Sequence, residues 1–240
     1  MPERSSRLNP STRALAGESL GSAGLAVVVI GSGIAAQSLS PGDTGLQLLE
    51  NALATAFGLT VLILVFAPVS GAHFNPVVTL VDILLHRRSW ATAAGYLPAQ
   101  IVGCITGAVL ANLLFDVPAI AWSTTDRSAA NLLLSEVVAT AGLITVIFAL
   151  VRTGRSAWAA PAVGAYIGGA YFFTSSTSFA NPAITIGRMF SDTFAGIAPA
   201  SAPAFIGAQL IGAAVGLMVV RLLFPVAAPD PTTAPTAATA

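Results

Sequence analysis

Six long apolar stretches, separated by short polar connections, run along the chain. A membrane-spanning helix needs about 20 mainly apolar residues. Stretches of that kind lie at 15–39, 46–66, 92–115, 132–151, 158–174 and 204–224. The first also fits a cleaved signal peptide, but its apolar run is long and no second feature requires cleavage. The pattern therefore predicts an all-α membrane protein with six spanning helices.

Two further segments each begin with polar residues, continue with Asn-Pro and end in an apolar run. The motifs are Asn75-Pro76-Val77, within 70–85, and Asn181-Pro182-Ala183, within 178–190. Asn is a favoured N-cap and Pro is favoured at the first helical position, so each motif predicts a helix that begins there. Ten to twelve helical residues extend about 15 to 18 Å, half of a hydrocarbon core. We expect two half-helices that enter from opposite faces and together cross the membrane once.

The two halves of the chain repeat these features in the same order. A lone acid, Glu18 or Glu136, stands near the start of an apolar run in each half, and an Ala-Gln-x-x-Gly segment follows the Asn-Pro motif. Three spans plus a half-helix make the repeat, and an odd number of spans forces the second copy to insert upside down. Such an inverted repeat places a site at the bilayer midplane.

One channel domain, preceded and followed by polar tails, is the domain organisation that we expect. Its predicted bounds are 14–226, with repeats at about 14–115 and 131–226, an N-terminal cytoplasmic tail at 1–13 and a disordered tail, rich in Pro, Thr and Ala, at 227–240.

Composition narrows the function classes. Charged residues are 8% and hydrophobic residues 55% of the 240 residues, too few charges to cover a soluble surface. Ten acids balance ten bases without a basic run, which argues against nucleic-acid binding. One cysteine and two histidines are too few for a cysteine or histidine metal cluster, and a Walker-type phosphate loop is absent. We expect no enzyme activity, catalytic residue, metal or cofactor.

All ten basic residues are Arg, and their distribution predicts the orientation. With six spans, both termini share a side with the second and fourth connections. That side receives Arg4, Arg7, Arg13, Arg87, Arg88, Arg152, Arg155 and Arg221, whereas the other receives Arg127 and Arg188. Arg-rich connections stay in the cytoplasm. We therefore expect a multi-pass protein of the plasma membrane with both termini cytoplasmic.

The residues around the two Asn-Pro motifs resemble those of the aquaporin and glycerol-facilitator family. The segments that carry the resemblance are Ser70-Gly-Ala-His-Phe-Asn75-Pro-Val-Val-Thr79, Ser178-Phe-Ala-Asn181-Pro-Ala183 and Tyr96-Leu-Pro-Ala-Gln100, with Glu18 and Glu136. One Asn-Pro-Ala occurs by chance, but two at matching places in an inverted repeat are specific. The resemblance covers nearly the whole chain outside the tails. It implies an aquaporin-like fold and a homotetramer with one pore per subunit.

The N-terminal ends of the two half-helices would face each other at the midplane. The first backbone N–H groups of a helix lack partners, and the helix dipole places about half a positive charge there. Two such ends repel cations, including a hydrated proton. The amides of Asn75 and Asn181 donate to a passing oxygen and so interrupt a chain of waters along which protons hop. Helix capping alone is the alternative role for both, and the two roles are compatible.

The buried acids and His73 each have two interpretations. An acid inside a membrane is a functional hypothesis by default, so Glu18 and Glu136 are either a proton relay or hydrogen-bond anchors. The resemblance implies that they hold the loops before the half-helices, which we favour. For His73 we favour a packed loop residue over a ligand or a pH gate.

Selectivity in the family that the chain resembles rests on four positions outside the midplane. Carried over, they fall at Phe57, Gly169, Ser178 and Ile184. Ile184 stands where the family usually has Arg, and Gly169 where water-selective members have His. Without that guanidinium and that ring, the constriction is wide and mainly apolar. The next basic residue, Arg188, lies one turn further on, either at the outer mouth or in solvent, and we favour solvent.

These features favour a passive channel for water and small uncharged solutes. The stretch from Asn181 to Arg188, followed by Ser191-Asp-Thr-Phe-Ala-Gly196, resembles a bacterial subgroup associated with neutral metalloid acids such as arsenous acid. A glycerol facilitator is the nearest alternative. The other hypotheses are a proton-coupled transporter that uses Glu18 and Glu136, and a membrane adhesion or scaffold protein with an occluded pore.

Overall fold

The computed structural model describes residues 9–85 and 87–225, which form helices joined by loops. The long helices are α1 (Pro10–Leu39), α2 (Thr44–Ser70), α4 (Trp90–Leu114), α5 (Ala130–Arg152), α6 (Ala159–Phe173) and α8 (Ala202–Leu223). The short ones are α3 (Pro76–Leu84), α7 (Pro182–Gly187) and the 3₁₀ turns η1 (Ser156–Trp158) and η2 (Arg188–Phe190). The tail predicted over 227–240 and most of the tail predicted over 1–13 lie outside the described residues.

Several helix bounds differ from the sequence prediction. Helix α2 ends at Ser70 rather than near residue 66, and the half-helices α3 and α7 have 9 and 6 residues rather than ten to twelve. Helix α1 begins at Pro10 rather than near residue 15, because the Asn9 side chain caps it by accepting from the Thr12 amide at 3.0 Å. Helix α6 has 15 residues, about 22 Å at the usual rise, and the turn η1 extends it by about 6 Å. The other five long helices each have the length and apolar composition of a membrane span.

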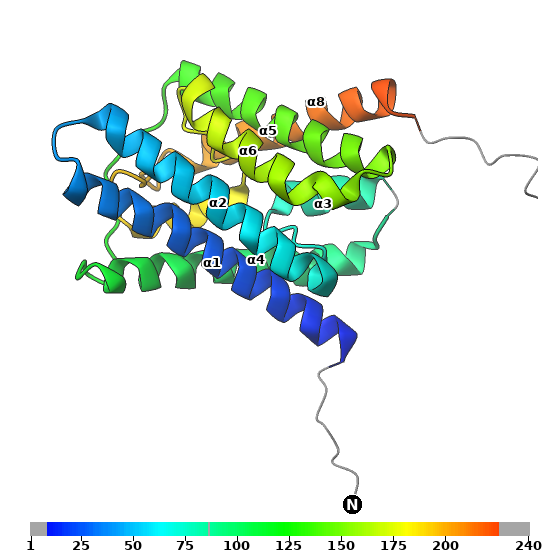
Figure 1. The fold of residues 1–240 in the computed structure, drawn as a ribbon, viewed down its shortest axis with the longest axis horizontal. Helices are drawn as coiled ribbons and strands as arrows, with labels where there is room; N and C mark the ends of the chain where they lie inside the picture. The colour runs from blue at the N-terminus through cyan, green and yellow to red at the C-terminus, as the bar shows by residue number, and fades with distance from the viewer. Residues whose placement is uncertain (1–8, 86, 226–240) are drawn as a thin grey trace, which may run out of the picture.

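The two halves of the chain pack in the same way. Helix α1 lies along α4, and the equivalent α5 lies along α8, while α2 and α6 join the halves (Figure 1). Glycines allow the close approach within each pair. A Cβ atom added at Gly103 of α4 would collide with the carbonyl oxygen of Ser19 in α1, and one at Gly212 of α8 would lie 2.5 Å from the carbonyl oxygen of Val137 in α5.

The short helices α3 and α7 fill the space between the halves and begin near its centre. Each follows a loop that returns into the molecule, 71–74 before α3 and 174–180 before α7. Helix α3 runs toward the face on which α1 begins, which we call the α1 face. Helix α7 runs toward the opposite face, which carries the connections 115–129 and 191–201 and which we call the loop face (Figure 1).

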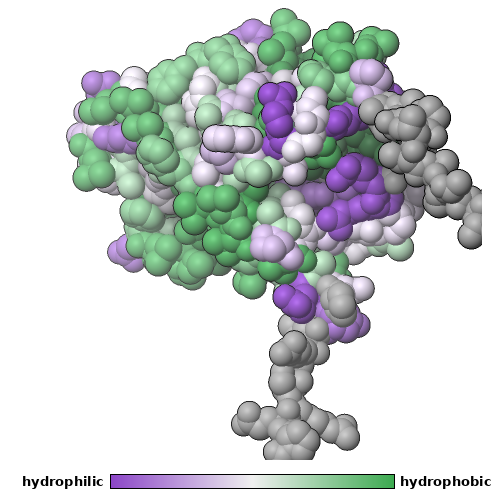
Figure 2. Space-filling model, turned by 45° about the vertical axis from the view of Figure 1, so that its right-hand side comes forward, coloured by the Kyte–Doolittle hydropathy of each residue, from purple (hydrophilic) through white to green (hydrophobic). Residues whose placement is uncertain are grey.

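Apolar side chains cover much of the outer surface. Leu64, Val102, Leu134 and Leu222 are all more than half exposed. Figure 2, in which the right-hand side of Figure 1 has come forward, shows large hydrophobic areas on the visible surface, with the largest hydrophilic area on the right and smaller ones near the edges. Exposed apolar side chains on this scale are costly in water and stable in a lipid environment.

Candidate functional site

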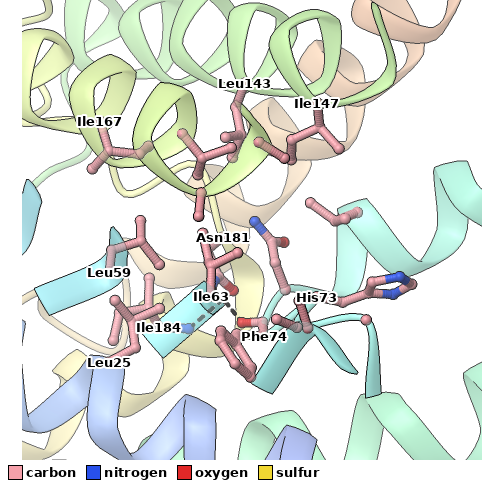
Figure 3. Close-up of a pocket in the computed structure, with 18 of the residues that line it drawn as sticks. Leu25, Leu59, Ile63, His73, Phe74, Leu143, Ile147, Ile167, Asn181 and Ile184 are labelled. Atoms are coloured by element: carbon pink, nitrogen blue, oxygen red, sulfur yellow. Dashed lines mark hydrogen bonds between the residues drawn. The ribbon is translucent and has the colours of Figure 1, made fainter. Parts of the chain in front are cut away.

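The two Asn-Pro motifs meet at the centre of the molecule and are joined by reciprocal hydrogen bonds. The Asn75 amide donates to the carbonyl of Ala180 at 2.8 Å. The Asn181 amide donates to the carbonyl of Phe74, also at 2.8 Å (Figure 3). Each side-chain oxygen caps its own half-helix, from Asn75 to the Val77 amide at 3.1 Å and from Asn181 to the Ala183 amide at 2.9 Å.

Each of these amides keeps a hydrogen for another acceptor. An amide nitrogen carries two hydrogens, and the structure assigns one of them to the facing loop. Asn75 and Asn181 are 4% exposed and both border a cavity. Capping and cavity lining are therefore compatible at both residues.

The loop before α3 is held by one carboxylate. Glu18, fully buried, accepts hydrogen bonds from the Ser70 hydroxyl at 2.6 Å and from the backbone amides of His73 and Phe74 at 3.0 and 2.8 Å. The side chain of Gln100 donates the fourth at 2.7 Å. This loop needs such support because Ala72 and Phe74 have positive φ angles of 51° and 50°, which L-residues adopt at a cost.

The loop before α7 is held in the same way. Glu136, also fully buried, accepts from the Ser176 hydroxyl at 2.7 Å and from the amides of Phe179 and Ala180, both at 2.9 Å. Gln209 donates the fourth hydrogen bond at 2.7 Å. The acids thus have all their oxygens occupied by the loops and by Gln side chains, and neither borders the cavity.

A cavity of about 540 Å³ extends past both Asn side chains. Most of its walls are apolar, and the labelled part in Figure 3 is dominated by aliphatic side chains. Those residues are Leu25, Leu59, Ile63, Leu143, Ile147, Ile167 and Ile184. Polar groups occur at the Asn pair and toward the two ends, which include Arg87 and Arg88 on the α1 face and Arg188 on the loop face. Such a path suits small uncharged molecules that carry a few hydrogen-bonding atoms.

Toward the loop face the cavity is bordered by a polar pair that the sequence did not reveal. The hydroxyls of Thr55 in α2 and Tyr171 in α6 lie 3.1 Å apart, and both residues border the cavity with Ser178 and Ile184. Sequence distance hides this pair, since 116 residues separate its members. Thr55 and Tyr171 are buried polar residues within apolar helices, which is the one signal that could have singled them out.

Arg188 borders the cavity on the same face and is 2% exposed. Its Nε donates to the carbonyl of Ala195, and its Cζ lies 3.4 Å from the centre of the Phe179 ring. The favoured interpretation of Arg188 as a solvated residue is therefore wrong. The loop 191–201 folds back over the end of α7, so the guanidinium finds an acceptor and an aromatic face inside the protein.

On the α1 face, His73 packs as expected for a loop residue. Its Nδ1 lies 3.0 Å from the Thr79 hydroxyl, and its ring meets Tyr96 edge-on at 5.6 Å. Its Nε2 lies 3.7 Å from Asp82, whose carboxylate is paired with Arg87 and Arg88. No group of three or more His, Cys, Asp or Glu side chains with metal-binding geometry occurs in the described part of the chain.

Comparison with known proteins decides the family. The model of the family described as major intrinsic protein matches residues 5–180. The chain belongs to the major intrinsic protein family. It is 44% identical over 231 residues to aquaglyceroporin AqpS of Rhizobium meliloti, a match that covers 93% of this chain and 97% of that protein. It is also 37% identical over 109 residues to aquaporin-B of Dictyostelium discoideum, covering 41% of this chain and 37% of that protein.

A solved structure supports the fold of this major intrinsic protein. The X-ray structure of the aquaglyceroporin from Plasmodium falciparum superposes with a TM-score of 0.70 at 21% identity, covering 89% of this chain and 96% of that one. The resemblance read from the two Asn-Pro motifs, and the all-α, aquaporin-like fold class, are therefore confirmed. The chain is a multi-pass membrane protein of a channel family.

Two of the four residues that the family resemblance assigned to the constriction of this major intrinsic protein border the cavity, and two do not. Ser178 and Ile184 border the cavity, but Phe57 is 69% exposed and Gly169 is exposed on the outside of α6. Neither residue borders the cavity, whereas Thr55 and Tyr171, two residues away on the same helices, do. A step of two along an α-helix turns the side chain by about 200°, so a small alignment error moves a residue from the cavity to the outer surface.

Proposed function

We propose that this major intrinsic protein is a passive channel for water and small uncharged solutes with a wide constriction on the loop face. The observation that carries the proposal is the cavity that runs past both Asn amides and meets the aliphatic side chain of Ile184 where the family usually places Arg. A guanidinium at this place would narrow the path and bring up to five fixed donors. Ile184 leaves the path wider and apolar.

Passive flux fits the buried acids better than proton coupling does. A proton relay needs carboxylates that water or solute reaches, whereas Glu18 and Glu136 are fully buried and each accepts four hydrogen bonds. Anchoring of the two loops is therefore the role that we assign to them.

Arsenous acid is the solute that we propose to test first. It is neutral at neutral pH, compact and rich in hydroxyl groups, so it suits an apolar path with donors at Asn75 and Asn181. Glycerol is the second candidate, because the 44% identical relative is named an aquaglyceroporin. Both require more width than water does.

We further infer a homotetramer in the plasma membrane with both termini cytoplasmic. The exposed apolar side chains, Phe57 among them, supply surface for lipid and for neighbouring copies. Within the described residues, Arg13, Arg87, Arg88, Arg152, Arg155 and Arg221 lie toward the α1 face, and Arg127 and Arg188 toward the loop face. This bias favours a cytoplasmic α1 face.

Position 184 offers a direct test of the wide path. In proteoliposomes, Ile184→Arg should lower arsenous acid and glycerol influx by about tenfold or more, equivalent to about 1.4 kcal/mol of barrier, while water influx falls less. Ile184→Leu is the matched control, since it keeps volume and polarity and should retain the wild-type rates. Equal influx through the wild type and Ile184→Arg would contradict the proposal.

A further inference from the structure

The two half-helices differ in charge at one equivalent position. Asp82 lies seven residues after Asn75, and Arg188 lies seven residues after Asn181. In the first half the acid is neutralised: Arg87 Nε lies 3.0 Å from one carboxylate oxygen of Asp82 and Arg88 Nε lies 3.1 Å from the other. At the seventh residue after each Asn, the first half-helix therefore carries an ion-paired Asp toward the α1 face, and the second half carries an Arg toward the loop face.

The charge of Arg188 has no carboxylate beside it. All ion pairs within 4.0 Å in the described part of the chain involve Asp82. The other charge near the Phe179 ring is also an arginine, Arg127, whose Cζ lies 4.9 Å from the ring centre. Glu136 belongs to the same region, and its carboxylate, held by loop amides, Ser176 and Gln209, offsets part of the positive charge of the two arginines. Two arginines and one carboxylate leave a net positive charge at this end of the cavity.

The two arginines near Phe179 have different tasks. Arg127 donates to the carbonyls of Gly196, Ser176 and Phe194 at 2.8, 3.3 and 3.4 Å and does not border the cavity, so it fastens the loops. Arg188 borders the cavity, and among the described residues only its Nε has a hydrogen-bond acceptor. Stacking on the ring fixes the plane of the Arg188 guanidinium and leaves its Nη donors for a molecule in the cavity.

Other polar residues border the cavity at this end. Ser178 is one of them, and its buried hydroxyl has no protein partner in the described part of the chain. The hydroxyl pair of Thr55 and Tyr171 lies on the same cavity. An oxygen-bearing neutral solute thus meets several hydrogen-bonding groups, whereas a cation meets a net positive charge in a weakly polarisable setting.

We propose that Arg188 is the selectivity residue of the loop face: from a position one turn beyond Ile184, its charge excludes cations while its Nη donors bind the oxygens of neutral hydroxylated solutes. This inference rests on the channel function proposed above. This position makes cation exclusion compatible with a wide path. The guanidinium lies against Phe179, so it places positive charge beside the cavity without filling the space at Ile184. The barrier adds to that of the half-helix dipoles at the centre.

Two substitutions separate the charge of Arg188 from its structural contacts. Arg188→Gln keeps an N–H donor but removes the charge, and Arg188→Lys keeps the charge; both lose the planar guanidinium. The probe is methylammonium uptake into proteoliposomes under an inside-negative potential, at a pH where the probe is fully protonated. We expect Arg188→Gln to raise this uptake about tenfold, equivalent to about 1.4 kcal/mol of barrier, and Arg188→Lys to stay near the wild-type rate.

Control variants separate the effect of charge from that of loosened loops. Arg188→Met replaces Arg188→Gln if the latter does not fold, and Arg127→Lys, which keeps the charge but loses the guanidinium contacts, reports leakage caused by loosened loops. No rise in methylammonium uptake with a folded neutral variant, or an equal rise in Arg188→Lys or Arg127→Lys, would overturn the inference. Glycerol influx, measured on the same vesicles, tests the channel itself: its absence in the wild type would refute the proposed function whatever the cation uptake shows.

Discussion

The loops that lead into α3 and α7 share their support but differ at their ends. In both, a buried Glu accepts from a Ser hydroxyl, two backbone amides and a Gln side chain, and that Gln also donates to a Thr of the half-helix, Thr79 at 3.0 Å or Thr185 at 2.9 Å. The Asn amides then donate across the centre to each other's loop. These contacts define the scaffold, and the inverted repeat keeps them alike.

Away from the centre the two halves diverge. His73 of the first loop corresponds to Phe179 of the second, both two residues before an Asn, and Asp82 corresponds to Arg188. The Asp82 end is a closed set of ion pairs, whereas the Arg188 end is a stacked cation beside unpaired donors. The scaffold is thus symmetric, while the charges that a solute meets at the two ends are not.

Removal of the anchoring carboxylate from either half should have the largest effect. Glu18→Ala and Glu136→Ala should each destabilise the protein by several kcal/mol, because every buried donor left without a partner costs about 1–3 kcal/mol. Thermal unfolding in detergent should show similar losses for the two variants, and solute influx should be abolished in both. A variant that keeps wild-type stability would disprove the equivalence of the two anchors.

A charge change on the α1 face should affect cation uptake less than a charge change at Arg188. Asp82→Asn removes the acid that pairs with Arg87 and Arg88, so it adds positive charge at that end. We expect methylammonium uptake to stay within about twofold of the wild type, since Arg87 is half exposed and screened by water. Leakage as large as that expected for Arg188→Gln would mean that charge at either end governs cation exclusion.

The smallest effect is expected at Phe57. Because this side chain is 69% exposed and lies outside the cavity, Phe57→Ala should change arsenous acid influx by less than about twofold. Thr55→Val, two residues away, removes a hydroxyl from the cavity wall and should alter influx more. The opposite order would restore Phe57 to the constriction and contradict the geometry described above.

The residues that the structure brings together at the centre could be singled out from the sequence because their signals are local. Asn75, Asn181, Glu18 and Glu136 are isolated polar residues within apolar runs, and their order repeats in the two halves. The family and fold class followed from them and are confirmed by the comparisons. The reciprocal hydrogen bonds of Asn75 and Asn181 follow once the two halves face each other.

The constriction was harder to predict because it depends on helix rotation and tertiary contacts. Phe57 and Gly169 were each placed two residues from Thr55 and Tyr171, which border the cavity. The burial of Arg188 depends on Phe179 and Ala195, two residues of different loops. Helix periodicity alone fixes neither the rotation of α2 and α6 nor the path of those loops.

Arsenous acid influx into proteoliposomes at neutral pH, with and without a proton gradient, distinguishes a passive wide channel from a proton-coupled transporter. We expect influx well above that of empty vesicles, proportional to the solute concentration and equal under both conditions, because the cavity offers a path and the buried acids offer no coupling. Influx that collapses with the gradient, or that equals the rate of empty vesicles while reconstitution is verified, would contradict a passive wide channel.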